Sequence, residues 1–280
     1  MSVERGSPNP AEWPARCEDV LRRMYDAVSR CTVPISISLN DMHGKHLGTG
    51  SFVDLGGIIT LVSCEHVIGK RKNNNLAHRV VGIDRYIALT GPGALIVEPV
   101  DVGVAAISAL LWDEHSRTSE AIPESRLAVL HDAAPNELFF VFGFAEENSS
   151  FFFDALEVNG TAYLCREAPL PPHSRLDPQI HFALEYNRDL ATKVFGEHGL
   201  PKPPGMSGSL VWNTRFVECS SQGKEWEPGY ADVAGVIWFW TGDDVIAATR
   251  IEYVRSFLLT VAASWGRDRA EADETVEPQP

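Results

Sequence analysis

Three short segments of the chain carry residue types that suit nucleophilic catalysis. His66 ends the segment TLVSCEH, in which an apolar stretch runs into a turn; Asp101 opens the apolar segment DVGVAAI; and Ser207 lies inside PPGMSGSLV. An imidazole that is oriented by a carboxylate can take the proton of a serine hydroxyl, which then attacks a carbonyl carbon. We therefore predict acyl transfer with Ser207 as nucleophile, His66 as general base and Asp101 as the carboxylate that orients it.

The glycines beside Ser207 fit the same chemistry. Gly205 lets the backbone approach a substrate closely and adopt conformations that other residues avoid. The backbone amides of Gly205 and Ser207 are then candidates for the oxyanion hole, in which each donor contributes about 3–4 kcal/mol to lowering the barrier. Taken singly, each segment also fits an ordinary structure: a Gly/Ser turn, a structural histidine, or an aspartate at a strand edge.

The combination of these segments resembles the chymotrypsin-like serine proteases and their bacterial intracellular relatives. TLVSCEH stands where that family has its T-A-A-H-like turn, DVGV where it has D-[IL]-A-[LV], and GMSGS where it has G-[DN]-S-G-G. The order His, Asp, Ser is also that of the family. GTGSFV at residues 48–53 and AGVIWFW at residues 234–240 are similar to two further strands of the family.

The resemblance implies an all-β fold of two antiparallel β-barrels, with an N-terminal and a C-terminal helix. It places His66 and Asp101 in the first barrel and Ser207 in the second. It also implies peptide-bond hydrolysis through an acyl-enzyme, with a protein or peptide as substrate. The positions similar to the family's substrate cleft are Pro201, Trp238, Phe239 and Trp240. An uncharged Pro201 gives no reason to expect preference for Lys or Arg in the primary pocket, and the substrate backbone is expected to pair with the edge of residues 238–240.

One position departs from the family pattern. Met206 stands where secreted members have an aspartate that pairs with a newly cut N-terminal amine, so activation by N-terminal trimming is not expected. Two hypotheses remain. Pro201, Pro203 and Pro204 stiffen the loop by fixing φ, or an activating protein partner orders it.

The hydrophobic pattern predicts few helices and many short strands. Residues 15–30 are expected to form an amphipathic helix with Val20, Leu21, Met24, Ala27 and Val28 on the apolar face. Alternation and turn signals predict strands from Thr32 onward, and residues 251–263 a final helix. We expect an N-terminal extension over 1–31, a first barrel over 32–118, a second barrel with the C-terminal helix over 119–265, and a disordered acidic tail over 266–280.

Composition excludes several classes of function. A net charge of -14 argues against nucleic-acid binding, which needs a basic surface. No apolar run is long enough for a membrane span or a signal peptide. The five scattered cysteines fit reduced thiols in a cytoplasm, and no structural metal or other cofactor is expected, because no two cysteines form a usual zinc pair. The nine histidines include six that are interpreted as polar or loop residues, at positions 43, 46, 78, 115, 173 and 198.

Three alternatives remain open. The chain could be a catalytically inactive relative that serves as a peptide-binding or scaffold module. An esterase of the α/β-hydrolase class would show alternating strands and helices, the nucleophile ahead of the histidine, and G-x-S-x-G, whereas Ser209 stands here in place of the second glycine. A purely structural β protein is the third.

Overall fold

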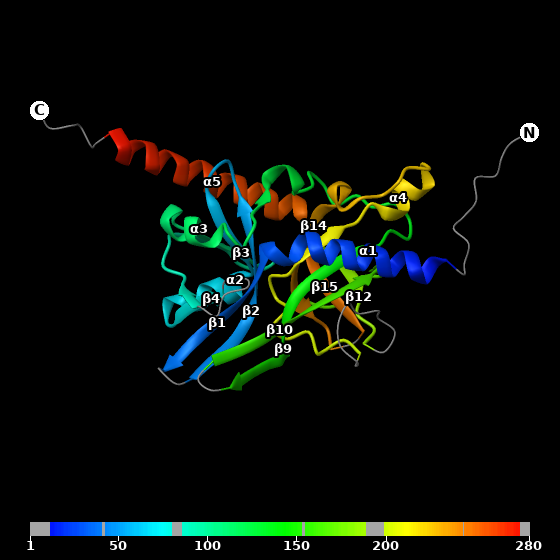
Figure 1. The fold of residues 1–280 in the computed structure, drawn as a ribbon, viewed down its shortest axis with the longest axis horizontal. Helices are drawn as coiled ribbons and strands as arrows, with labels where there is room; N and C mark the ends of the chain where they lie inside the picture. Colours follow the sequence, from blue (N-terminus) through cyan, green and yellow to red (C-terminus); the bar gives the residue numbers. More distant parts are fainter. Residues whose placement is uncertain are drawn as a thin grey trace, which may run out of the picture.

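The fold is built from two curled antiparallel sheets, each forming a half-barrel, with one long helix near each end of the chain (Figure 1). The computed structural model describes residues 12–40, 43–79, 86–152, 155–188, 199–242 and 244–274. The predicted all-β fold class with N-terminal and C-terminal helices is confirmed. The strands follow one another in an open order rather than a closed ring, so each sheet curls without closing.

The first sheet has eight strands in the order β5-β4-β1-β2-β3-β7-β6, with β8 paired in parallel to β2. Its central strands are short segments of β-branched and aliphatic residues, and both faces of β3 are covered. The bounds are β1 Thr32–Asn40, β2 His43–Asp54, β3 Ile59–Ser63, β4 Asn75–Arg79, β5 Tyr86–Ala88, β6 Gly93–Ile96, β7 Val102–Ala106 and β8 Ile122–Pro123.

The second sheet has seven strands in the order β10-β9-β13-β14-β15-β12-β11. Their bounds are β9 Phe139–Phe152, β10 Ala155–Cys165, β11 Glu167–Ala168, β12 His181–Glu185, β13 Leu210–Asn213, β14 Asp232–Trp240 and β15 Val245–Arg250. The two sheets thus take strands from separate parts of the chain. The predicted boundary at 118/119 remains a prediction; β8, which follows it, pairs with the first sheet.

The N-terminal helix α1, Trp13–Val28, packs its apolar face onto the strands, as predicted. Val20, Leu21, Met24 and Val28 are buried, and the ring of Tyr25 meets that of Phe142 in β9 edge to face at 5.3 Å. Ala27 is exposed, so its predicted place on the apolar face is wrong. It lies next to Asp26 on the solvent side, because the buried stripe is narrower than the sequence pattern suggested.

The C-terminal helix α5 is longer than predicted: it runs over Ile251–Glu274 and so continues past Trp265 into the stretch that was expected to be disordered. Val254, Leu258 and Val261 are buried, which anchors its first half. The sequence RDRAEADE lacks large apolar residues, but Ala, Glu and Arg are good helix formers, and Arg267 and Arg269 each precede an acidic residue by four positions, which favours a helix. Residues 275–280 of the predicted tail and 1–11 of the N-terminal extension lie outside the described residues.

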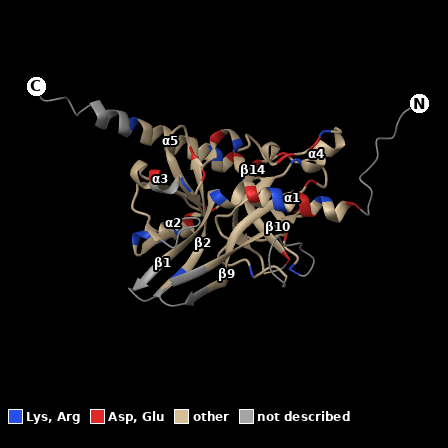
Figure 2. Ribbon diagram, viewed as in Figure 1, with Lys and Arg blue, Asp and Glu red and all other residues tan. Residues whose placement is uncertain are grey.

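Short helices complete the chain: η1 Ser29–Cys31, α2 Glu65–Ile68, η2 Gly69–Lys72, α3 Ala109–His115, η3 Glu124–Arg126, α4 Phe216–Ser221 and η4 Pro228–Tyr230. Acidic and basic residues alternate along α1, where Asp19 pairs with both Arg22 and Arg23 (Figure 2). None of the helices among the described residues is sufficiently long and apolar to cross a membrane.

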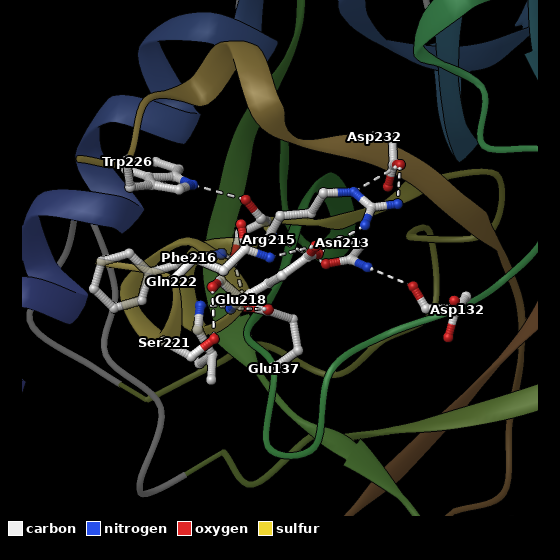
Figure 3. Close-up of polar contacts among 12 residues, drawn as sticks. Asp132, Glu137, Asn213, Arg215, Phe216, Glu218, Ser221, Gln222, Trp226 and Asp232 are labelled. Carbon is white, nitrogen blue, oxygen red and sulfur yellow. Dashed lines mark hydrogen bonds and ion pairs between the residues drawn. The ribbon is translucent and has the colours of Figure 1, made fainter. Parts of the chain in front are cut away.

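A buried carboxylate holds α4 against the second sheet (Figure 3). Glu137 is 2% exposed and accepts hydrogen bonds from the amides of Val217 and Glu218, at 2.9 and 3.0 Å, and from the hydroxyl of Thr214 at 3.3 Å. A carboxylate at a helix N-terminus satisfies amides that have no partner inside the helix. Beside it, Arg215 has a left-handed φ of 55° and pairs with Asp232 at 2.7 Å. These polar contacts fix the chain directly after β13.

Replacing Glu137 with Ala is expected to lower the free energy of unfolding by about 3 kcal/mol, because several buried donors lose their acceptor at once. Urea denaturation followed by circular dichroism measures this loss. Glu225, an exposed carboxylate in the following loop, is the matched control, and its Ala variant should change stability by less than about 0.5 kcal/mol. Equal stability of the two variants would contradict the anchoring role of Glu137.

Candidate active site

His66 lies just beyond the end of β3, on the short helix α2. Cys64 keeps an extended backbone, and Val67 and Ile68 turn into the core, so the backbone on both sides of His66 is fixed. The ring itself stays accessible, with 45% of its side chain exposed. A strand end followed by a buried turn therefore presents a rigidly attached imidazole to solvent, as predicted from TLVSCEH.

Asp101 is buried beside His66 and bonded to it twice. Its side chain is 2% exposed; Oδ2 accepts from Nδ1 of His66 at 2.6 Å, and Oδ1 accepts from the backbone amide of His66 at 3.1 Å. A carboxylate accepts only, so Nδ1 carries the hydrogen and Nε2 is left as the acceptor of a proton. The structure thus brings His66 and Asp101 together in the arrangement that a general base requires.

The segment before Asp101 is tied to the second sheet. Thr249 in β15 donates its hydroxyl to the carbonyl of Val100 at 2.8 Å, and Nε2 of His181 in β12 donates to the carbonyl of Pro99 at 2.7 Å. Nδ1 of His181 accepts from the amide of Asp177, so the hydrogen is on Nε2. Asp101 itself has a left-handed φ of 50°, a strained conformation that its own bonds to His66 and the bonds to the preceding carbonyls maintain.

Ser207 occupies the second position of the latter of two consecutive tight turns. The amide of Met206 donates to the carbonyl of Pro203 at 2.8 Å, and the amide of Ser209 donates to that of Met206 at 3.0 Å. The third residue of each turn is a glycine with positive φ, 95° at Gly205 and 92° at Gly208. Proline followed by glycine with positive φ is typical of a type II turn, so PPGM predicts this geometry from sequence.

The carbonyls of residues 203–207 are all engaged, which fixes the direction of the amides between them. The carbonyl of Pro204 accepts from the amide of Glu146 at 2.7 Å, and the Met206 carbonyl is used by the second turn. In a trans peptide the N–H points opposite to the C=O. The amides of Gly205 and Ser207 therefore point away from these partners, and neither donates to an acceptor within the described residues. They are available as the predicted oxyanion donors.

Two side chains from the first sheet hold the loop from behind. Nε2 of His46 donates to the carbonyls of Phe144 and Gly205, at 2.7 and 3.2 Å, and the hydroxyl of Thr49 donates to that of Gly205 at 3.1 Å. The amide of Thr49 also binds the carbonyl of Ser207 at 2.8 Å. His46 and His78 were predicted to be polar or loop residues. This is wrong, because both lie buried in strands, 1% and 0% exposed.

The loop of Ser207 packs directly on the turn that carries His66. An added Cβ at Gly48 would lie 2.7 Å from Cγ2 of Val67 and 3.0 Å from the carbonyl oxygen of Ser207, so both segments touch this one glycine. A Cβ at Gly208 would lie 2.1 Å from Oγ of Ser63. Both glycines are thus required by close approach. Within the described residues, the side chains of Ser207 and His66 share no hydrogen bond.

Met206 is buried completely in the core of the second sheet, at 0% exposure. Tyr186 contacts the loop at two points. Its hydroxyl lies 2.8 Å from the carbonyl of Pro201 and 3.4 Å from Sδ of Met206. An apolar side chain therefore occupies the interior position for which the resembling family uses an ion pair. Of the two hypotheses for ordering the loop, these contacts and the Pro-Gly turn favour a pre-formed loop.

Three of the predicted substrate-binding residues, Trp238, Phe239 and Trp240, form the end of β14, whereas Pro201 lies in the irregular segment before the loop of Ser207. Pro201 is buried, Trp238 is 3% exposed, and Phe239 and Trp240 are partly exposed. β13 pairs with β14 only as far as Leu210 opposite Val236, whereas the pairing with β15 continues to Trp240. Beyond Ile237, whose carbonyl accepts the amide of Gly208 at 2.7 Å, this edge of β14 has no neighbouring strand among the described residues.

A third polar group lies at the pair of His66 and Asp101. Ligand atoms of Cys64, His66 and Asp101 lie within 4.8 Å of one another, which is a spacing that a metal ion could use. These atoms already have partners, however, since His66 binds Asp101 and Sγ of Cys64 donates to the carbonyl of Ile237 at 3.1 Å. Burial and the charge of Asp101 raise the pKa of the Cys64 thiol well above its usual value, which disfavours the thiolate that a metal needs.

Comparison with known proteins gives structural neighbours only. No protein-family model and no curated protein match the chain. A structure from work on the VPg protein of Sesbania mosaic virus is similar with a TM-score of 0.46 and 12% identity, covering 81% of this chain and 90% of that one. The inactive form of the Rv3671c protease is similar with a TM-score of 0.45 and 13% identity, covering 89% of this chain and 93% of that one.

The apo MamO protease domain from Magnetospirillum magneticum gives a TM-score of 0.48 at 13% identity, with 83% of this chain and 98% of that one covered. At such scores and identities these likenesses assign neither a family nor an activity to the chain. The chemistry of the site has to be argued from its own residues.

Replacement of Met206 by Asp is expected to lower the free energy of unfolding by about 3 kcal/mol or more, because a carboxylate without a partner would be buried there. Met206→Leu conserves volume and apolar character and should cost less than about 1.5 kcal/mol. Urea denaturation of both variants measures the difference. If Met206→Asp is as stable as Met206→Leu, the loop is not held by burial of this side chain.

Stability is expected to fall on acidification. Burial is the largest cause that lowers the pKa of both His46 and His181. A lowered pKa means that the unfolded chain binds protons more readily, so the stabilisation is complete above the unfolded value of about 6.5 and is lost as the pH falls through the folded values. The midpoint of urea unfolding, measured from pH 8 to pH 5, should therefore decrease below about pH 6.5.

His46→Gln keeps a donor for Phe144 and Gly205 but does not titrate, so its midpoint should decline less over the same range. An unchanged decline in this variant would exclude His46 as a source of the pH dependence.

Proposed function

We propose that the chain is a serine endopeptidase with a triad of Ser207, His66 and Asp101. The observation that carries this proposal is the double hydrogen bond between His66 and the buried Asp101, directly against the loop of Ser207. A buried carboxylate that fixes the tautomer of an exposed imidazole has a clear use when a hydroxyl must lose a proton nearby. The same pair is hard to explain by stability, since half of the imidazole lies in solvent.

In the proposed reaction, Ser207 Oγ attacks the carbonyl carbon of a peptide bond and its proton moves to Nε2 of His66. Asp101 stabilises the imidazolium that forms. The amides of Gly205 and Ser207 donate hydrogen bonds to the oxyanion. This stabilisation is greater when the donors are fixed in advance. His66 then gives the proton to the leaving amine. In the second step water attacks the acyl-enzyme, and His66 takes a proton from the water and gives it to Ser207 Oγ as the acyl group leaves.

The open edge of β14 is the proposed binding site for the substrate backbone. A peptide that adds as a strand beside residues 238–240 would extend the sheet past the point at which β13 ends. Ser207 lies at this junction, because Gly208 bonds to Ile237 at the last paired position. The carbonyl of the bound peptide would then pass beside the nucleophile. The predicted role of Pro201 is indirect in this arrangement, since its carbonyl is already held by Tyr186.

The compartment and regulation belong to the same proposal. All five cysteines are free, and four of them are buried, which supports a reducing compartment such as the cytoplasm. A protease in that compartment needs restraint, so limited proteolysis of a narrow set of substrates, with or without a regulatory protein partner, is the proposed context.

A second candidate function is a peptide-binding module without catalysis. One observation favours it: no hydrogen bond joins Ser207 and His66 in the described part of the chain. The site would then retain the open edge of β14 but lack an activated nucleophile. Catalytic hydrogen bonds often tighten only when substrate is bound, so the geometry without substrate leaves the endopeptidase as the first candidate.

Labelling with a fluorophosphonate separates the two candidates. The purified chain is expected to be labelled on Ser207, with loss of the label in Ser207→Ala and His66→Ala, and peptidase activity should fall by about 10⁴-fold or more in either variant. Ser209→Ala is the matched control: this neighbouring serine is buried, its Oγ has no partner, and labelling should persist. An unlabelled wild-type chain would favour the binding module.

A further inference from the structure

The strip of β14 beside the candidate site is covered by one of the protein's own cations. The guanidinium carbon of Arg175 lies 5.0 Å from the ring centre of Trp238 and 4.7 Å from that of Phe239. Its Nε donates to Oε2 of Glu98 at 3.1 Å and its Nη2 to Oε1 of the same carboxylate. Glu98 lies between β6 and β7 of the first sheet, and the two rings belong to β14 of the second sheet.

These contacts form a complete cation site. Ring faces attract a cation through their quadrupole, and a carboxylate that meets a guanidinium with two parallel bonds adds charge and direction. Glu98, Trp238 and Phe239 supply both elements, and the chain carries a net charge of -14, which favours basic partners. The occupant of this site is a residue of the same chain.

The site lies where a substrate side chain would have to pass. Glu98 immediately precedes the segment of Pro99 and Val100 that the second sheet holds next to Asp101. Trp238 follows Ile237, to which the loop of Ser207 is bonded. A peptide that adds to the open edge of β14 would therefore place side chains over Trp238 and Phe239, in the space that Arg175 fills.

Arg175 is held weakly enough to be displaced. Its side chain and that of Glu98 remain 41% and 50% exposed, and exposed ion pairs contribute little to stability because water and salt screen them. Arg175 also sits on the irregular segment before β12, where its backbone amide binds only Nδ1 of His173. Its ion pair with Glu98 is exposed to solvent, in contrast to the buried bonds at Pro99 and Val100, and its buried contact is the face of Trp238.

We propose that Glu98, Trp238 and Phe239 form a subsite for an arginine or lysine side chain of the substrate, and that Arg175 is its built-in occupant, which must leave before a peptide binds. The subsite deepens the proposed function and rests on it for its role in catalysis. It differs from the primary pocket that the resemblance places near Pro201, an uncharged residue. Removing Arg175 is expected to open the subsite and to create a preference for cationic side chains that the intact chain suppresses.

Binding to the non-hydrolysing chain tests the subsite without relying on activity. The probes are matched decapeptides in which each position in turn holds either arginine or citrulline, which has the same shape without the charge. Three proteins are compared by fluorescence anisotropy. The first is the single variant Ser207→Ala, the second is the double variant Ser207→Ala/Arg175→Ala, and the third is the triple variant Ser207→Ala/Arg175→Ala/Glu98→Gln. The second protein should bind the arginine peptide about tenfold more tightly than the citrulline peptide at one position, and the first less than about threefold.

Glu98→Gln should abolish the preference, because it removes the carboxylate. Arg175→Gln in place of Arg175→Ala guards against local disorder of the segment. Arg30→Ala, which removes a cation from an exposed pair with Glu120 of similar exposure, 45% and 54%, should leave binding unchanged. Absence of an arginine preference at every position in both Arg175 variants overturns the proposal.

Fluorophosphonate labelling of the Arg175→Ala variant, in which Ser207 is intact, tests the proposed hydrolysis separately from the proposed subsite. A labelled protein without any arginine preference keeps the endopeptidase and rejects the subsite. An unlabelled protein with the preference keeps the subsite and rejects hydrolysis, which leaves a binding module for basic peptides.

Discussion

A buried carboxylate needs hydrogen-bond donors, and the structure around Asp101 is arranged to supply them. At 2% exposure its charge is stable only because both oxygens accept hydrogen bonds from His66. Those bonds set the tautomer and the direction of the imidazole. The strained backbone of Asp101 is in turn maintained by Thr249 and His181, which hold the preceding carbonyls from the other sheet. One acid therefore connects the orientation of the base to the relative placement of the two sheets.

The nucleophile loop is subject to a different constraint, because two of its amides must stay free while the loop remains ordered. Engaging the carbonyls achieves this: Pro204, Gly205 and Ser207 are all bonded through oxygen. Met206 adds an apolar anchor in the core. Burial of a thioether needs no newly formed terminus and no pairing charge, so the loop can be ordered as soon as the chain folds. Packing and backbone geometry thus hold the loop in this structure.

Features that depend on local sequence were predicted well. Strand alternation from Thr32 onward and both terminal helices follow from residues close together in the chain. The missed features depend on partners far away in sequence: His46 binds Gly205 across 159 positions, and Arg175 binds Glu98 across 77. No periodicity reveals such pairs. The excess length of α5 was missed for another reason. Residues 266–274 have no large apolar side chain and were therefore expected to be disordered, although Ala, Glu and Arg favour a helix.

The contacts that join the two sheets near Asp101 fall into two kinds, and the difference suggests a division of roles. Bonds from His181 and Thr249 to the segment before Asp101 are buried, at 0% exposure for both side chains, and so resist water and salt. The pair of Arg175 and Glu98, close to them along the chain, is largely exposed and easily broken. In the proposed function, the first kind keeps the groups of the proton transfer at a fixed distance. In the proposed subsite, the second kind holds Arg175 over the edge of β14, so Arg175 can leave without disturbing the bonds between His66 and Asp101.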